Sequence, residues 1–132
     1  MREVERWFSE DGYDLETAKI LHSSRRFNAA CFYAHQAAEK SVKALLYSVN
    51  ESPWGHSVRV LIERYVEKTG DEKFMEFISL ARTLDAHYIP SRYPNAHPAG
   101  PAHEAYDENI SAQAIAAAEK IVREVEGRLG GK

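Results

Sequence analysis

Several kinds of residue are scarce in this chain, and each scarcity excludes a class of protein. The 132 residues contain a single cysteine, Cys31, so no intramolecular disulfide can form and cysteines cannot build a zinc site. No apolar run is long enough to span a membrane, and the first eight residues, MREVERWF, are too charged for a secretory signal. The net charge of −3 provides no broad basic surface for duplex DNA. We therefore expect one cytoplasmic domain over residues 1–132.

Proline is scarce as well, but four of the five prolines lie between Pro90 and Pro101. On both sides of that cluster the apolar residues recur at intervals of three, four and seven, which is typical of amphipathic helices. No strand pattern is present. We predict an all-α fold, an up-and-down bundle of four to five helices with one long proline-rich loop before the last helix. The predicted helices cover residues 4–22, 27–50, 57–69, 74–87 and a last segment that begins at Asp107 or Ser111 and ends at Gly130-Gly131.

The segment 27–50 has no glycine or proline and is rich in alanine, so we predict that it is the central helix of the bundle. His35 and Glu39 lie four residues apart in an otherwise apolar row of this helix, and burial requires that each finds a polar partner. Asp11 and Asp14 lie at the edge of the apolar stripe of the first helix. We expect both to be solvated, with the alternative that one reaches inward to a buried arginine or amide.

Metal and nucleophile chemistry are not indicated. His35 and Glu39 have a helical ligand spacing, and His97, His103 and Glu104 cluster near the loop, but no HExxH motif and no matched pair on a second helix is present. Cys31 lies on a small apolar face, where a buried thiol is usually inert. We therefore expect neither a metal nor another cofactor.

The proline-rich loop is the best candidate for function, because long irregular loops in compact domains often carry it. Arg92 is flanked by Tyr88 and Tyr93, and an arginine beside aromatic rings can grip a phosphate and stack a base. His97 lies five positions further on. An arginine and a histidine can cleave RNA without metal, one stabilising the phosphorane and the other moving the proton. The alternative is that Arg92 pins the loop by pairing with an acid, namely Asp11, Asp14 or Asp85.

Three segments together resemble the HEPN domain, a small helical module of prokaryotes and higher eukaryotes. They are WFSEDGYDLETAKIL from Trp7, FNAACFYAHQAAEKSVKALL from Phe27 with the following Gly55-His56-Ser57, and LDAHYIPSRYP from Leu84. The resemblance implies a bundle of four to five helices, a homodimer, and pairing with a separate small nucleotidyltransferase. Many members are metal-independent ribonucleases with an arginine and a histidine four to six residues apart, whereas others bind nucleotides or RNA. Arg92 and His97 satisfy this spacing. Proteins of this subgroup tend to read Arg-Tyr-Pro-Asp followed by an aromatic residue near position 97, so Asn95 and His97 depart from the subgroup pattern. Pro98-Ala99 depart from the ribonuclease motif, which often continues after the histidine with a polar residue and a tyrosine.

Three hypotheses follow. In the first, the chain is a nucleotide- or RNA-binding regulatory module of a toxin–antitoxin-like pair with a nucleotidyltransferase. Its ligand contacts would be Arg92, Tyr93, His35, Gln36, Lys40 and Lys43. In the second, it is an endoribonuclease toxin in which Arg92 and His97 of two subunits meet across a homodimer. In the third, it is a structural dimerisation module without a ligand.

Overall fold

The computed structural model describes residues 2–130, with side chains from residue 3 onward, and this part of the chain forms helices and no strand. The α-helices are α1 (Arg2–Ser23), α2 (Phe27–Ser48), α3 (Val58–Thr69), α4 (Ile78–Asp85) and α5 (Glu108–Gly130). Three short 3-10 helices are η1 (Glu72–Phe77), η2 (Pro94–Ala96) and η3 (Ala102–Ala105). The predicted all-α bundle with a long loop before the last helix is confirmed.

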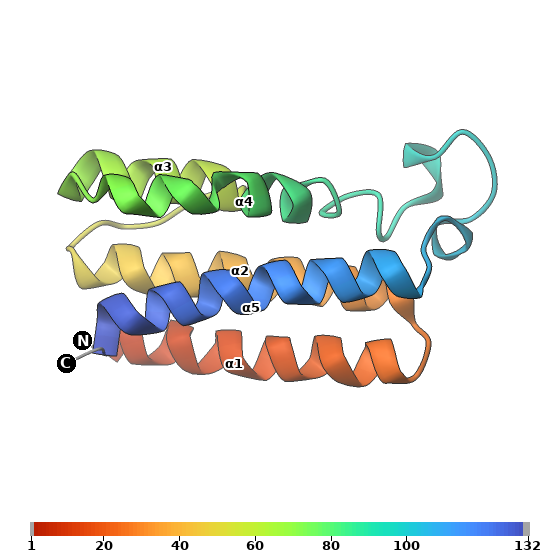
Figure 1. Ribbon diagram of the computed structural model, residues 1–132, viewed down its shortest axis with the longest axis horizontal. Coiled ribbons are helices and arrows are strands. Elements are labelled where there is room, and N and C mark those ends of the chain that lie inside the picture. The colour runs from red at the N-terminus through yellow and green to blue at the C-terminus, as the bar shows by residue number, and fades with distance from the viewer. Residues whose placement is uncertain (1, 131–132) are drawn as a thin grey trace.

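The helices are arranged around α2, which contacts α1, α3, α4 and α5. In Figure 1, α1, α2 and α5 run side by side, and the shorter α3 and α4 lie over α2 and α5 as a further layer. The proline-rich loop projects at the end of the bundle where α1 turns into α2. The central place of α2 follows from its small side chains, since Ala30, Ala34 and Ala38 are fully buried and let neighbouring backbones approach closely.

The helix boundaries follow local capping chemistry. Ser57 is the predicted N-cap of α3, and its side chain accepts a hydrogen bond from the backbone N–H of Val60 at 3.1 Å. Gly70 ends α3 in the left-handed conformation, with a φ of 78°. Asp107 begins α5, because its carboxylate accepts the N–H of Ile110 at 2.9 Å. These three boundaries were predictable because each depends only on neighbouring residues.

The predicted fourth helix is wrong in one respect. The segment begins as a 3-10 helix, η1, and becomes an α-helix only at Ile78, ending at Asp85 rather than His87. Phe74 is fully buried within η1 and packs edge-on against Tyr65 and Phe77, with both ring centroids 5.7 Å away. Packing of this ring against α3 is a contact between two elements, which the apolar spacing within one segment does not contain.

The expectation of a solvated Asp11 and Asp14 is also wrong, because only 1% of Asp11 and 4% of Asp14 is exposed. Asp14 forms an ion pair with Lys40 of α2 at 2.7 Å, so its partner is neither an arginine nor an amide. One carboxylate oxygen of Asp11, Oδ2, is buried without a hydrogen-bond partner. Burial, with the nearby charges of Asp14 and Glu126, raises the pKa of Asp11 to about 8.

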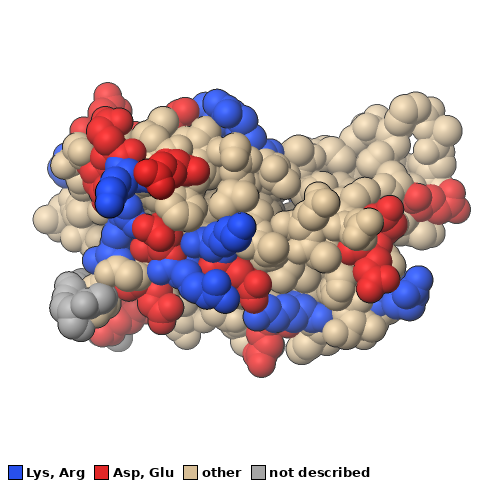
Figure 2. Space-filling view, in the orientation of Figure 1, with Lys and Arg blue, Asp and Glu red and all other residues tan. Residues whose placement is uncertain are grey.

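Charged residues are unevenly spread over the face seen in Figure 2. Both signs are mixed over one half, whereas the upper part of the projecting loop is tan and acidic atoms lie along its lower edge. In the sequence, Arg92 is the only Lys, Arg, Asp or Glu between residues 86 and 103. Among the described residues, no helix combines the length and apolar character needed to cross a bilayer.

Candidate functional site

The proline-rich loop is tied to the bundle immediately before Arg92. Ser91 is fully buried, and its carbonyl accepts a hydrogen bond from the Asn28 side-chain amide of α2 at 3.0 Å. The Ser91 N–H donates to the carbonyl of His87 at 3.2 Å. Because the backbone is anchored on both sides of this residue, the next side chain, Arg92, is presented at the surface from a fixed position.

The guanidinium of Arg92 lies in a cage of three aromatic rings. Its central carbon is 4.4 Å from the ring centroid of Phe32, 4.7 Å from that of Tyr88 and 5.1 Å from that of Tyr93. Its Nε and Nη2 donate to the carbonyl of Tyr88 at 2.9 and 2.7 Å. Within residues 2–130, Nη1 has no acceptor, and the residue as a whole is exposed.

The alternative in which an acid pins Arg92 is therefore wrong. Asp14 is paired with Lys40, and Asp85 is held at the start of α3, as described below. Aromatic faces and one carbonyl orient the guanidinium without neutralising it. A cation that is positioned but not neutralised is suited to an anionic ligand.

His97 is held within the same loop but does not contact Arg92 in the described structure. Its Nε2 lies 2.7 Å from the carbonyl of Pro90, and its ring meets the edge of Tyr106 with centroids 6.3 Å apart. Because a carbonyl only accepts, Nε2 carries the proton and Nδ1 has the free lone pair. The two residues of the predicted catalytic pair are thus both positioned, but one chain does not bring them together.

The α2 residues predicted to contact a ligand mostly find partners inside the bundle. His35 is fully buried, with Nε2 3.1 Å from Asp85 and Nδ1 3.3 Å from Gln36. Lys40 pairs with Asp14, and Lys43 lies 2.9 Å from a carboxylate oxygen of Glu39. Of the predicted binding residues, only Tyr93 lies beside Arg92.

Asp85 joins α2, α3 and α4. Its Oδ1 accepts from the N–H of Val58 at 2.8 Å and faces His35, and its Oδ2 accepts from the Ser57 hydroxyl at 2.7 Å and from the N–H of Arg59 at 3.2 Å. Burial by itself raises the pKa of Asp85, but these hydrogen bonds outweigh burial and hold the pKa below its ordinary value. The sequence offered one signal for this contact. The first turn of α3 contains no acidic residue, so the partial positive charge at its N-terminus favours a carboxylate from another part of the chain.

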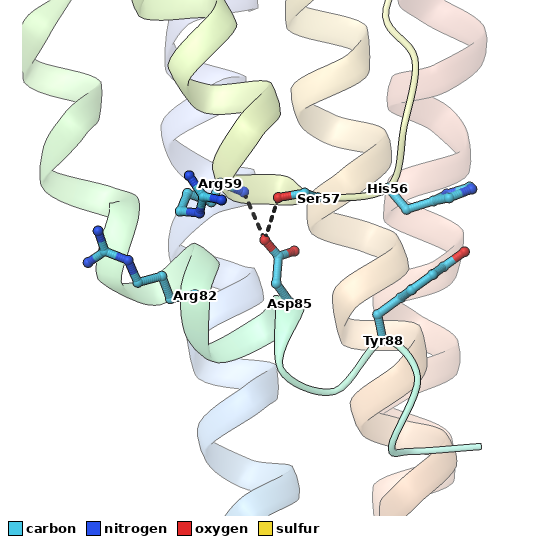
Figure 3. A pocket seen from close by; sticks show the side chains of 6 residues that line it. All are labelled: His56, Ser57, Arg59, Arg82, Asp85 and Tyr88. Atoms are coloured by element: carbon cyan, nitrogen blue, oxygen red, sulfur yellow. Dashed lines mark hydrogen bonds between the residues drawn. The ribbon is translucent and has the colours of Figure 1, made fainter. Parts of the chain in front are cut away.

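His56 is a functional candidate that sequence reasoning did not single out. Its Nδ1 lies 3.3 Å from Glu39, its side chain is 59% exposed, and its ring stacks on Tyr88 with centroids 5.0 Å apart. Beside this stack is a hollow of about 330 Å³ lined by His56, Ser57, Arg59, Arg82, Asp85 and Tyr88 (Figure 3). In the sequence, His56 stood out only as part of the Gly55-His56-Ser57 segment of the family resemblance. The spacing of residues along the chain does not show that this segment lies next to Tyr88.

Metal chemistry finds no support in the part of the chain that the structure describes, where no three His, Cys, Asp or Glu side chains are grouped to hold an ion. Burial raises the pKa of the Cys31 thiol to about 12, in keeping with an inert cysteine. What the site offers instead is a caged arginine, two further arginines and an exposed imidazole.

Comparison with known proteins identifies the fold family. The family model described as the HEPN domain matches residues 4–128. The chain belongs to the HEPN family. A HEPN homologue of known structure, the archaeal protein ST0689, superposes with a TM-score of 0.80 and 34% identity, over 97% of this chain and 98% of that one. The HEPN domain protein tm0613 of Thermotoga maritima gives 0.74 and 29%, over 94% and 97%.

A further solved structure, TT1696 of Thermus thermophilus, has a TM-score of 0.91 and 34% identity, covering 98% of this HEPN chain and 100% of its own. One curated relative, named "Putative toxin MJ1304", comes from Methanocaldococcus jannaschii and is 29% identical over 89 residues. That alignment covers 64% of this chain and 59% of the relative, so the HEPN chain matches little more than half of the relative's length.

Proposed function

We propose that this HEPN protein binds the phosphate group of a nucleotide or RNA at Arg92, with Tyr93 beside it. The observation that supports the proposal is the cage: three rings and one carbonyl hold the guanidinium, and Nη1 is directed to no acceptor in the described residues. Charge-assisted hydrogen bonds from arginine to phosphate are among the stronger polar contacts in proteins. The surrounding segment is uncharged in the sequence, so nothing adjacent along the chain competes for the cation.

The proposed ligand contacts are narrower than those predicted from the sequence. His35, Lys40 and Lys43 are left out because carboxylates within the bundle already neutralise or accept from them. Gln36 is left out because its amide oxygen faces the buried His35 ring. These residues contribute to the site by fixing α2 behind it.

The partners that we propose are those that membership of the HEPN family suggests. We infer that two HEPN chains form a homodimer, and that a separate small nucleotidyltransferase is the partner, as in a toxin–antitoxin-like pair. The toxin relative supports a place in such a pair, although the match covers 59% of that protein. A cytoplasmic location stays a prediction and agrees with a nucleotide or RNA ligand. Sedimentation of the purified chain and co-purification with a nucleotidyltransferase test the two partners separately.

The binding proposal is tested by comparing Arg92→Gln with Arg123→Gln, which removes another exposed charge, from α5. Unfolding temperature and fluorescence anisotropy are measured with ATP and with a fluorescein-labelled ten-nucleotide RNA. A ligand at 100 times its Kd stabilises the protein by about 2.7 kcal/mol, which is a measurable shift. We expect Arg92→Gln to reduce binding about tenfold or more and Arg123→Gln to leave it unchanged. Absence of any shift with both ligands would overturn the proposal.

A second candidate function is metal-independent RNA cleavage by Arg92 and His97. Its support is the fixed imidazole of His97, whose Nδ1 is free to take a proton, together with the toxin relative. The pair would have to be completed across the homodimer, since the two side chains do not meet in one chain. The test is cleavage of RNA in the presence of EDTA. Activity that survives His97→Ala excludes this mechanism while leaving the binding proposal intact.

A further inference from the structure

The hollow next to the His56–Tyr88 stack has cationic side chains on one wall and aromatic rings on the other. Figure 3 shows Arg59 and Arg82 on one side of Asp85 and the parallel rings of His56 and Tyr88 on the other side. Its volume of about 330 Å³ falls within the range of small-ligand sites. A phosphate with an attached sugar and base has this combination of requirements, an anion on one side and a flat apolar face on the other.

Asp85 lies in the floor of the hollow, and hydrogen-bond donors within the bundle already occupy its carboxylate oxygens. Both carboxylate oxygens accept from the start of α3, and Oδ1 also faces His35. The N-terminus of a helix carries a partial positive charge that offsets a carboxylate in this position. Asp85 therefore orients α3 and leaves the arginines beside it available to a second anion.

Arg82 and Arg59 can each contact a further anion, for different reasons. Arg82 is exposed, and within the described residues no carboxylate lies within 4 Å of it. Arg59 pairs with Glu63 four residues away at 3.0 Å, with 40% and 43% of the two side chains exposed. An exposed pair of this kind contributes little to stability, so a phosphate can replace Glu63 at Arg59.

His56 adds an oriented imidazole. Its Nδ1 faces Glu39, a carboxylate of which only 4% is exposed and which can only accept, so Nδ1 carries a proton. Nε2 is the atom left for a ligand, and it donates to a phosphate oxygen in the imidazolium form, in which both ring nitrogens carry protons. Lys43 lies 2.9 Å from the same oxygen of Glu39 and keeps that carboxylate in place. The imidazole is thus held from within the bundle, with its outer nitrogen exposed beside the arginines.

Tyr88 connects this hollow to Arg92. The ring centroid of Tyr88 is 5.0 Å from that of His56 and 4.7 Å from the guanidinium carbon of Arg92, so the His56 ring and the Arg92 guanidinium cannot be further apart than these two steps together. The ring of Tyr88 therefore lies between the His56 imidazole and the Arg92 guanidinium. Two separated phosphate positions match a nucleic acid strand, in which a ribose carrying a stackable base separates successive phosphates, and differ from ATP, whose phosphates are contiguous.

We propose that the hollow lined by His56, Arg59 and Arg82 is a second phosphate subsite, and that the ligand is a single RNA strand bound across Tyr88 to both this subsite and Arg92. The inference rests on the proposed function, because it takes Arg92 as the first subsite. It assigns to His56 Nε2 and the two arginines the neighbouring phosphate of the same strand.

The test uses the ten-nucleotide labelled RNA with Arg82→Gln, His56→Gln and the control Arg123→Gln, each first checked for an unchanged unfolding temperature. We expect Arg82→Gln and His56→Gln each to raise the Kd for RNA about tenfold. We also expect Arg82→Gln to reduce the slope of log K against log salt by about 0.7, the value for one phosphate contact on a single strand. Arg123→Gln leaves both quantities unchanged.

The outcomes separate this inference from the proposal it rests on. If Arg92→Gln weakens RNA binding and the Arg82 and His56 variants do not, the second subsite is wrong and the proposed function stands. If ATP competes as well as the unlabelled decamer, and Arg82→Gln weakens both equally, the strand-like ligand is wrong. If the wild-type protein binds neither RNA nor ATP, both proposals are overturned.

Discussion

Two aspartates of this HEPN domain are embedded among the helices, and their environments act in opposite directions. Asp11, on α1, is 1% exposed, and its Oδ2 has no hydrogen-bond partner. It also lies near two other acids, and its pKa is raised to about 8. Asp85, between α4 and α3, accepts hydrogen bonds on both oxygens, and its pKa is lowered. Burial opposes the charged form in both cases. Whether hydrogen-bond donors surround the carboxylate therefore decides whether its pKa is raised or lowered.

The two aspartates also differ in whether they hold helices together. The donors around Asp85 come from the first turn of α3 and from α2, so this carboxylate joins three helices and shapes the proposed second subsite. Asp11 joins nothing through Oδ2, and the bundle forms in spite of it. Substitutions at the two positions should accordingly change the free energy of unfolding with opposite signs.

The largest effect is expected for Asp85→Ala. The change removes the acceptor of four hydrogen bonds and leaves His35 buried without its partner, so we expect a loss of about 4 kcal/mol in the free energy of unfolding. Urea unfolding at pH 7 measures it.

The pH dependence of that loss follows from the lowered pKa of Asp85. The carboxylate stabilises the fold above its unfolded-state pKa, and the contribution disappears as the pH falls through the lower folded-state value. Wild type and Asp85→Ala should therefore differ by a constant amount above about pH 5 and converge in stronger acid. A difference that instead grows in acid contradicts the assignment.

The next effect has the opposite sign. In Asp11→Asn the amide replaces a carboxyl whose pKa is raised to about 8, and each pKa unit corresponds to about 1.4 kcal/mol. Allowing for relaxation of α1, we expect the variant to be more stable than wild type by about 3 kcal/mol at pH 8.

The sign for Asp11 follows from proton binding. Between its ordinary pKa and about 8, the folded state keeps the Asp11 proton and the unfolded state loses it, so wild-type stability falls as the pH rises through this range. Asp11→Asn removes that slope, and the two proteins should be equally stable near pH 4. Thermal unfolding at a series of pH values shows whether they diverge upward, and Glu10→Gln, an exposed acid of α1, is the matched control.

The smallest effect is expected at Ser57, which belongs to the Asp85 side of the comparison. Ser57→Ala removes the cap of α3 and one donor to Asp85, but the backbone donors of Val58 and Arg59 remain. We expect a loss of about 1 kcal/mol, measured by urea unfolding. A loss as large as that of Asp85→Ala would show that the hydroxyl, and not the helix terminus, holds the carboxylate.

Sequence reasoning succeeded where a feature depends on neighbouring residues. The apolar spacing located α1, α2 and α5, Ser57 and Asp107 were recognisable as caps, and the proline cluster marked the loop that holds Arg92. It failed where a feature depends on what packs from another helix. The spacing of Asp11 and Asp14 shows only that they border an apolar stripe; in the folded chain Asp14 is buried beside Lys40 of α2, and Asp11 is buried near Glu126 of α5.

The candidate site was predictable to the same extent. Arg92 with Tyr88 and Tyr93 could be proposed because the three residues are adjacent in the chain, whereas Phe32 completes the cage from α2. His56 could not be found from spacing, since it comes within stacking distance of Tyr88 only when α3 and α4 pack on α2.

The sequence by itself determined the helices, their caps, the position of the irregular loop and the family, because periodicity, capping and motifs are local properties of the chain. Only the tertiary structure decided which charges are satisfied. It paired Lys40 with Asp14 and His35 with Asp85, and left Arg92 oriented but not neutralised. The physical reason is that desolvation and hydrogen bonding depend on all the elements that surround a group, and these are brought together only by folding.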